Sequence, residues 1–203
     1  CPSSSLHAVH PSTLRPRRNL PRSVSAVIKI ISALLTDKSW RVRHAAMQLL
    51  PYLAPQMSPD AFNKSFELDS HALKFSQDNT ARIPQDWIVC CKAIADCPGY
   101  GSEWLKAHIV PSLEKLLGEE AYQRKLVYLH AMNELGGLFG TQAMAEDFLP
   151  KALSMADDKK LPNLRMRCAE TLGIIAKDGG DGKPWVDATV VEQKIKPALQ
   201  KLA

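Results

Sequence analysis

Three cysteines and one histidine stand close enough in the sequence to suggest a metal site. They are Cys90, Cys91, Cys97 and His71. Structural zinc sites use thiolate and imidazole ligands, normally with cysteines paired as Cys-x-x-Cys. That pairing is missing here, and the cysteines fall in apolar helical patterns, where a thiol packs like a small hydrophobic side chain. We therefore expect these residues to belong to the core, with no metal site and no bound cofactor.

A second candidate is the stretch from Asp178 to Asp181, which is acidic and rich in glycine, as calcium-binding loops are. Such a loop alternates acidic ligands and ends in a glutamate, and neither feature is present. We predict a flexible loop between repeats. The sequence also has no His-Glu-x-x-His motif, no phosphate-binding glycine loop after a strand and no Ser/His/Asp set with nucleophile spacing. We therefore expect no catalytic residues and a protein that is not an enzyme.

Large side chains recur where one apolar helical pattern ends and the next begins. Trp40, Tyr122 and Leu161 occupy such turn positions, and Arg41 follows Trp40 directly. In one interpretation each side chain folds back onto its own helix pair. In the other they form a row of partner contacts, because aromatic and arginine side chains dominate binding hot spots and repeat turns line up along one edge. We predict Trp40, Arg41, Tyr122 and Leu161 as partner-binding residues.

The turns repeat with a regular spacing. The stretch Asp37 to Arg43 returns in altered form at Asp78 to Arg82, Glu119 to Arg124 and Asp157 to Arg165. A period of roughly 40 to 47 residues with two helices in each unit is typical of HEAT and armadillo repeats. The predicted fold is an all-α HEAT-repeat α-solenoid, a right-handed superhelix of antiparallel helix pairs with about four and a half repeats.

The positions of the apolar stripes also predict where the lead-in and each repeat begin and end. Residues 1–22 read as a basic lead-in rich in Pro, Ser and Arg, and residues 23–203 as the solenoid. The predicted repeats are 23–57, 58–98, 101–140, 142–177 and a half repeat at 188–203. One continuous helix is expected from Ser58 to about Ser76. Prolines recur at one position of the first helices and predict a kink in each; they are Pro111, Pro150 and Pro197.

Arginines near the starts of the second helices should hold the repeats together. We expect Arg43 and Arg165 to pair with turn acids such as Asp37 and Asp157.

The overall charge is positive but unevenly distributed along the chain. The net charge is +5 and the pI is about 9.0. The first 22 residues hold four arginines and no acid, so the remainder carries only +1. A basic tail of this kind does not predict a basic binding face. Without a long apolar run, and with five cysteines that suit a reducing compartment, the expected location is the cytoplasm, with the nucleus as a second location.

An ordered series of motifs resembles a known family from about residue 20 to the end. The series resembles the C-terminal part of the scaffold (A, regulatory) subunit of protein phosphatase 2A. It consists of Asp37 to Arg43 followed by Leu50 to Ala54, Tyr100 to Trp104 before Ile109 to Pro111, Phe148 to Pro150, Asn163 to Arg165, and Lys194 to Pro197.

The resemblance implies a non-catalytic solenoid whose last repeats hold the phosphatase catalytic subunit along their turns. Earlier repeats of the family hold a variable regulatory subunit. By position, Trp40, Arg41, Tyr122 and Leu161 match the family's turn contacts.

Two positions depart from the family pattern. Ala81 stands where a turn aromatic is expected, and Pro84 where the repeat arginine is expected. These departures leave one partner contact and one link between repeats in question.

Two other functions fit a helical-repeat fold. One is an adaptor of the nuclear-transport type that recognises peptides on its concave face. The other is a HEAT-fold nucleic-acid-binding protein, which would need clustered Lys and Arg on the concave helices. No nucleic acid and no membrane is expected among the partners.

Overall fold

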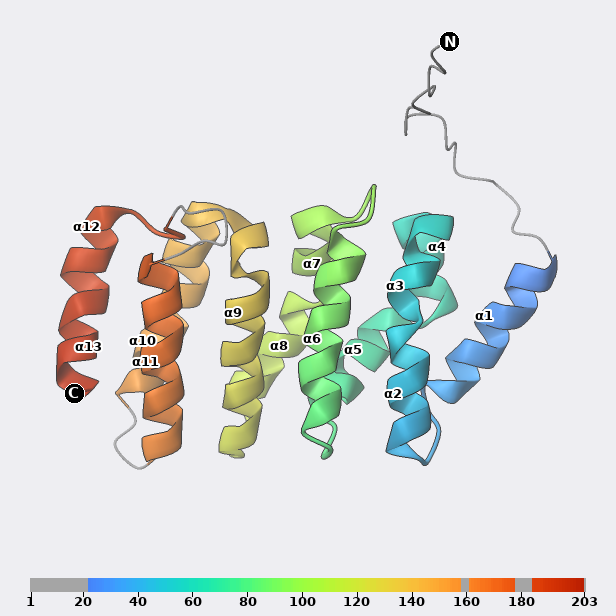
Figure 1. Cartoon of the computed structure of the whole chain (residues 1–203), viewed down its shortest axis with the longest axis horizontal. Helices are drawn as coiled ribbons and strands as arrows, with labels where there is room; N and C mark the ends of the chain where they lie inside the picture. The colour runs from blue at the N-terminus through green and yellow to red at the C-terminus, as the bar shows by residue number, and fades with distance from the viewer. Residues whose placement is uncertain (1–21, 158–160, 178–183, 203) are drawn as a thin grey trace, which may run out of the picture.

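Helices make up all the regular structure that the computed structural model describes, which covers residues 22–157, 161–177 and 184–202 (Figure 1). The helices follow one another as pairs, which confirms the predicted all-α solenoid. The first helices of successive pairs are α1 (Arg22–Leu34), α4 and α5 (Pro59–Ser65, Leu68–Ser76), α7 and α8 (Gly101–His108, Val110–Leu117), and η3 and α10 (Met144–Phe148, Leu149–Ala156). Their partners are α2 and α3 (Trp40–Gln48, Leu50–Leu53) with η2 (Ala54–Gln56), α6 (Arg82–Ala95), α9 (Tyr122–Ala143) and α11 (Pro162–Lys177). A last helical segment contains α12 (Ala188–Val190), η4 (Val191–Ile195) and α13 (Lys196–Leu202).

The pairs stack so that the helices form two layers. The second helices α2/α3, α6, α9 and α11 lie side by side at the front of Figure 1 and contact one another in that order. We call them the second-helix row. Behind them lie α4/α5, α7/α8 and α10, while α1 and α13 stand at the two ends. The turns that lead into α2, α6 and α9 lie along the lower edge of the view.

The core runs along the length of the molecule between the two layers. Its largest fully buried side chains include Phe62, Phe75, Trp87 and Tyr128, which come from both layers. Fully burying a side chain of this kind contributes roughly 2 to 3 kcal/mol. Because each apolar stripe is covered by the facing layer and by the adjacent pair, stacking rather than any single helix stabilises the fold.

The predicted proline kinks are confirmed. The helix with Pro111 is interrupted at Ile109, where φ is −105°, and splits into α7 and α8. Pro150 and Pro197 each follow a π-helical turn, η3 and η4 respectively. Proline has no N–H to donate, so the turn before it loses its regular hydrogen bond and rearranges.

The helix predicted from Ser58 to Ser76 is wrong as a continuous element. It breaks between α4 and α5 without any proline, at Glu67, whose φ of 44° and ψ of 47° are left-handed. The buried His71 stabilises the break, because its Nδ1 lies 2.8 Å from the carbonyl oxygen of Phe66 and 3.3 Å from that of Glu67. A helix interruption frees carbonyl groups, and a side-chain donor in the next turn satisfies them.

The last two helical segments are joined through a tryptophan. Trp185 and Val186 are buried, and the Trp185 backbone N–H donates to the carbonyl oxygen of Ile175 in α11 (3.3 Å). The indole ring lies against Gly136 of α9, where a Cβ atom would be 2.7 Å from Cε3 of the ring. Gly136 therefore provides the space that the ring fills.

Some predicted features lie outside the described residues. These are the loop from Asp178 to Asp181 and all but the last residue of the lead-in at 1–22. Among the helices that the structure describes, none combines the length and apolar character needed to cross a bilayer.

Candidate functional site at the intra-repeat turns

The first turn is held by two side chains from its own ends. The Asp37 carboxylate accepts a hydrogen bond from the backbone N–H of Ser39 (2.7 Å). From the other side, Arg43 Nη1 donates to the carbonyl oxygens of Asp37 (2.9 Å) and Lys38 (3.1 Å). Arg43 thus contacts Asp37 through the backbone instead of the predicted carboxylate pair. Both contacts fix the backbone that leads directly into Trp40.

Trp40 and Arg41 lie together at this turn. The guanidinium carbon of Arg41 is 4.9 Å from the Trp40 ring centroid, which is cation–π geometry. Trp40 is half-buried, packs on the core, and meets the His44 ring edge-on at 6.3 Å between centroids. Arg41 is exposed. One face of Trp40 is therefore anchored, and the pair offers an aromatic surface with a positive charge at its margin.

A hydrogen-bonded network links the first turn to the second. Arg43 donates to the Asp78 carboxylate from Nη2 (2.6 Å) and Nε (3.1 Å). The Asp78 side chain is only 10% exposed, and its other oxygen accepts from the Thr80 N–H (2.8 Å). A carboxylate with this many donors is well satisfied, so it can hold both its own turn and the arginine of the preceding pair.

The second and third turns are linked, although Pro84 stands where the arginine of the repeat was expected. Pro84 is buried, and Arg124 of α9 makes the connection by reaching back to the Asp78 carbonyl oxygen (3.2 Å). Arg124 also pairs with Glu119 of its own turn (3.5 Å), and Gln77 donates to the same Glu119 carboxylate. The linking arginine therefore belongs to the third helix pair rather than to the second. As a result, the first three turns form one connected edge.

The other predicted contact residues lie further along that edge. Tyr122 is the first residue of α9 and is half-buried. Leu161 directly precedes α11, is half-buried and packs on the core. Ala81, at the corresponding place before α6, is exposed. The structure brings Trp40 and Arg41 into contact and places Tyr122 and Leu161 at separate turns, so the four form a row and not a pocket.

Arg165, near the start of α11, contacts the last helix. Its Nη2 donates to the carbonyl oxygen of Lys201 in α13 (3.3 Å), and the described residues include no pair between Arg165 and Asp157. Arg165 therefore links α11 to the last helix.

Of the candidate zinc ligands, Cys90, Cys91 and His71 are buried in the core, as predicted, whereas Cys97 is only partly buried. Cys90 and Cys91 are buried in α6, and His71 holds the kink described above. Burial raises the pKa of Cys90 to about 12 and that of Cys168 to about 11, and it raises the pKa of Cys91 well above its ordinary value. These thiols stay protonated at neutral pH, because a buried thiolate would lose its hydration.

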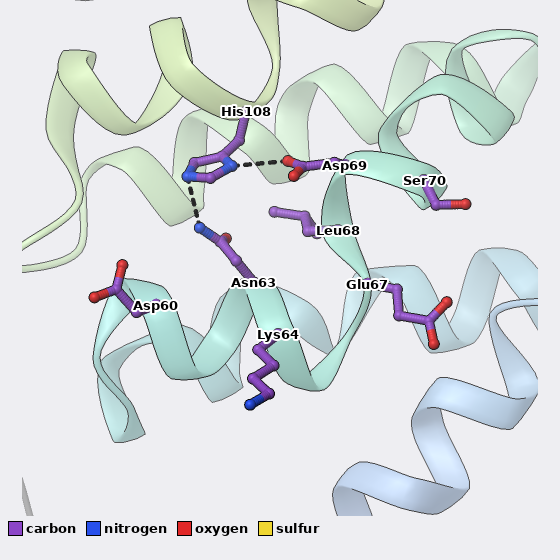
Figure 2. A pocket seen from close by; sticks show the side chains of 8 residues that line it. All are labelled: Asp60, Asn63, Lys64, Glu67, Leu68, Asp69, Ser70 and His108. Carbon is purple, nitrogen blue, oxygen red and sulfur yellow. Dashed lines mark hydrogen bonds and ion pairs between the residues drawn. The ribbon is translucent and has the colours of Figure 1, made fainter.

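Sequence reasoning missed a polar cluster between the second and third pairs (Figure 2). His108 of α7 lies between Asp69 and Asn63, with 2.7 Å from Nδ1 to the Asp69 carboxylate and 2.7 Å from Nε2 to the Asn63 amide nitrogen. The Asn63 oxygen accepts from the Trp104 indole N–H (3.0 Å). The cluster borders an open hollow, whose lining includes Asp60, Lys64 and Glu67, and joins α4, α5 and α7. Its members are about 40 residues apart, so no local spacing reveals it.

Comparison with known proteins bears on the fold. The HEAT repeat family matches residues 27–57, which contain the second half of α1, the first turn, and α2, α3 and η2. A search of curated proteins gave no significant match. HEAT units are helix pairs that stack into solenoids and bind other proteins along their surfaces. Together, the match and the stacked helix pairs identify the fold of the chain as an all-α HEAT-repeat solenoid.

Proposed function

We propose that this chain is a non-catalytic scaffold that binds the catalytic subunit of a type 2A Ser/Thr protein phosphatase through its intra-repeat turns. The observation that carries the proposal is the Trp40–Arg41 pair, an aromatic and an arginine stacked at 4.9 Å on a turn that Arg43 holds rigid. These are the residue types that most often anchor protein interfaces, and a preorganised turn loses little entropy on binding. The motif series described above supports the choice of partner.

The connected edge supports the same proposal. The Arg43–Asp78–Arg124 network fixes successive turns relative to one another, so contacts at Trp40 and Tyr122 are presented in a fixed order. A rigid partner can then bind several turns at once, which raises affinity without any single large contact. Leu161 extends the row, and a variable regulatory subunit would bind other repeats of a longer protein. The proposed location is the cytoplasm, with the nucleus as a second location.

Replacing Trp40 tests the proposal directly. We expect Trp40→Ala to weaken binding of a purified type 2A catalytic subunit by about 2 kcal/mol, or roughly thirtyfold in Kd, because it removes an anchor contact. Isothermal titration calorimetry with the full chain measures this, and circular dichroism verifies the fold.

The chain offers a matched control. Tyr52 is an aromatic residue of the same helix pair that is 77% exposed and lies away from the turn. Tyr52→Ala should leave catalytic-subunit binding unchanged. Equal losses in the two variants, or no loss in Trp40→Ala, would contradict the turn assignment.

A further inference from the structure

The second-helix row carries an excess of positive charge that the sequence alone obscures. Its helices hold nine Lys or Arg residues, two in α2, two in α6, two in α9 and three in α11, against three acids. The interior first helices α4, α5, α7, α8, η3 and α10 hold five Lys and six acids, and α1 and the α12–α13 segment at the ends each carry a net +2. The even balance of charge along the sequence after residue 22 therefore does not extend to the arrangement of the helices.

Much of this charge is not cancelled within the row. Its three acids, Asp86, Glu134 and Glu170, each pair with one cation of the row, at 3.0 Å, 3.6 Å and 2.6 Å. Arg43 and Arg124 pair with acids of the turns, at the lower edge of Figure 1. The other cations are Arg41, Lys125, Arg165 and Lys177. The row therefore keeps a net positive charge, with Arg41, Lys125 and Arg165 in the first turns of their helices and Lys177 at the end of α11.

Exposed apolar side chains occur on the same row. Among the described residues, five of the seven large exposed hydrophobic side chains belong to it, namely Leu49, Tyr52, Val89, Met166 and Ile174. Tyr52 is 77% exposed and Val89 50%. The first helices of the three interior pairs contribute no member to this group within the described residues. Single exposed hydrophobic residues are ordinary, but the occurrence of five of the seven on a row with a net positive charge indicates a contact surface.

We propose that this exposed side of the second-helix row, the second-helix face, binds an extended acidic segment of another protein that carries apolar side chains. Carboxylates of such a segment complement the excess of Lys and Arg, and its apolar side chains cover Tyr52, Leu49 and Val89. Packed helices are about 8 to 10 Å apart, so the row from α2/α3 to α11 spans roughly 25 to 30 Å, which about nine extended residues cover.

The apolar part of the second-helix face is separate from the turns. Tyr52 lies twelve residues after Trp40, which is roughly 18 Å along the helix axis. The two binding proposals can therefore fail independently.

Fluorescence anisotropy with a defined probe tests the proposal. The probe is a fluorescein-labelled peptide of about nine residues, which matches the estimated span, in which pairs of Glu alternate with pairs of Leu or Phe so that each face of the extended peptide carries both kinds of side chain. The full chain should bind it, more weakly at high salt, and should not bind the same peptide with Lys in place of Glu. We expect Tyr52→Ala to weaken binding about tenfold.

Two controls separate this face from other sources of binding. Val27 and Ile30 on α1 are also exposed hydrophobic residues, 44% and 60%, but lie outside the row, so Val27→Ala with Ile30→Ala should leave binding unchanged. Substituting Arg15, Arg17 and Arg18 by Gln removes charge from the lead-in and should change affinity less than twofold. A loss in either control as large as that of Tyr52→Ala would overturn the proposal.

Two further results would also overturn it. One is no binding of the acidic peptide to the folded chain. The other is tighter binding of a single-stranded oligonucleotide of about twelve nucleotides, which would assign the positive charge to nucleic acid.

Discussion

The two halves of the solenoid each contain a link of a different kind between helix pairs. Between the first and third pairs, charged side chains connect the turns, with Asp78 accepting from Arg43 and its carbonyl oxygen accepting from Arg124. Between the third pair and the last helical segment, the ring of Trp185 fills the space above Gly136. Charged links are directional and fix which residues face each other, whereas apolar filling supplies more free energy and less directional control. The turns of Trp40 and Tyr122 lie in the half where direction is fixed, and the turn of Leu161 lies in the other half.

Removing the tryptophan should produce the largest effect. We expect Trp185→Ala to lower the free energy of unfolding by about 3 to 5 kcal/mol, because it leaves a cavity over Gly136 and detaches the last helices. Chemical denaturation followed by circular dichroism measures the change. A loss below about 1 kcal/mol would show that the indole ring contributes little to the C-terminal half.

Gly136 sharpens this test. Gly136→Ala should cost about 1 to 3 kcal/mol in the native chain, because the new methyl group overlaps the ring. In the Trp185→Ala background the same change should cost much less, since the space is empty. Additive losses would contradict direct packing between the two residues.

Breaking the charged network should have an intermediate effect. Asp78→Ala removes the buried acceptor of Arg43, and we expect a loss of about 2 kcal/mol in the free energy of unfolding. Glu103→Ala is the matched control, because Glu103 pairs with Lys106 at 2.9 Å but is 83% exposed. Its removal should change stability by less than about 0.5 kcal/mol. Similar losses in the two variants would show that burial of Asp78 adds nothing.

The smallest effect concerns a second polar link between the first two pairs. Burial raises the pKa of Asp86, but hydrogen bonds from His44 and Arg82, and their charges, outweigh it and lower the pKa overall. An acid with a lowered folded pKa adds stability above its unfolded pKa of about 3.9, and this is lost as the pH falls through the folded value. We expect Asp86→Asn to cost less than about 1 kcal/mol at pH 7.

The pH dependence provides the check. The difference between Asp86→Asn and the native chain should shrink as the pH falls below about 4, in thermal melts recorded at several pH values. A constant difference across this range would show that the carboxylate charge is not the source of the stability.

The repeat pattern was predictable from the sequence because it depends on the local periodicity of apolar residues. Helical spacing of apolar residues gave the helix pairs, and the recurrent Pro111, Pro150 and Pro197 gave the interruptions of their helices. The kink at Glu67 was not predictable, since a left-handed residue there depends on His71 folding back onto the Phe66 carbonyl. The roles of Trp40, Arg41, Tyr122 and Leu161 as partner contacts remain predictions.

The sequence by itself determined the fold class, because period and apolar spacing are properties of neighbouring residues. Only the tertiary structure decided which side chains meet across repeats, such as Arg124 with Asp78 and Trp185 with Gly136, because those residues are about 45 to 50 positions apart. It also decided the distribution of charge. A chain with nearly balanced charge after its first 22 residues places nine cations on one row of helices, because stacking separates residues that alternate along the sequence.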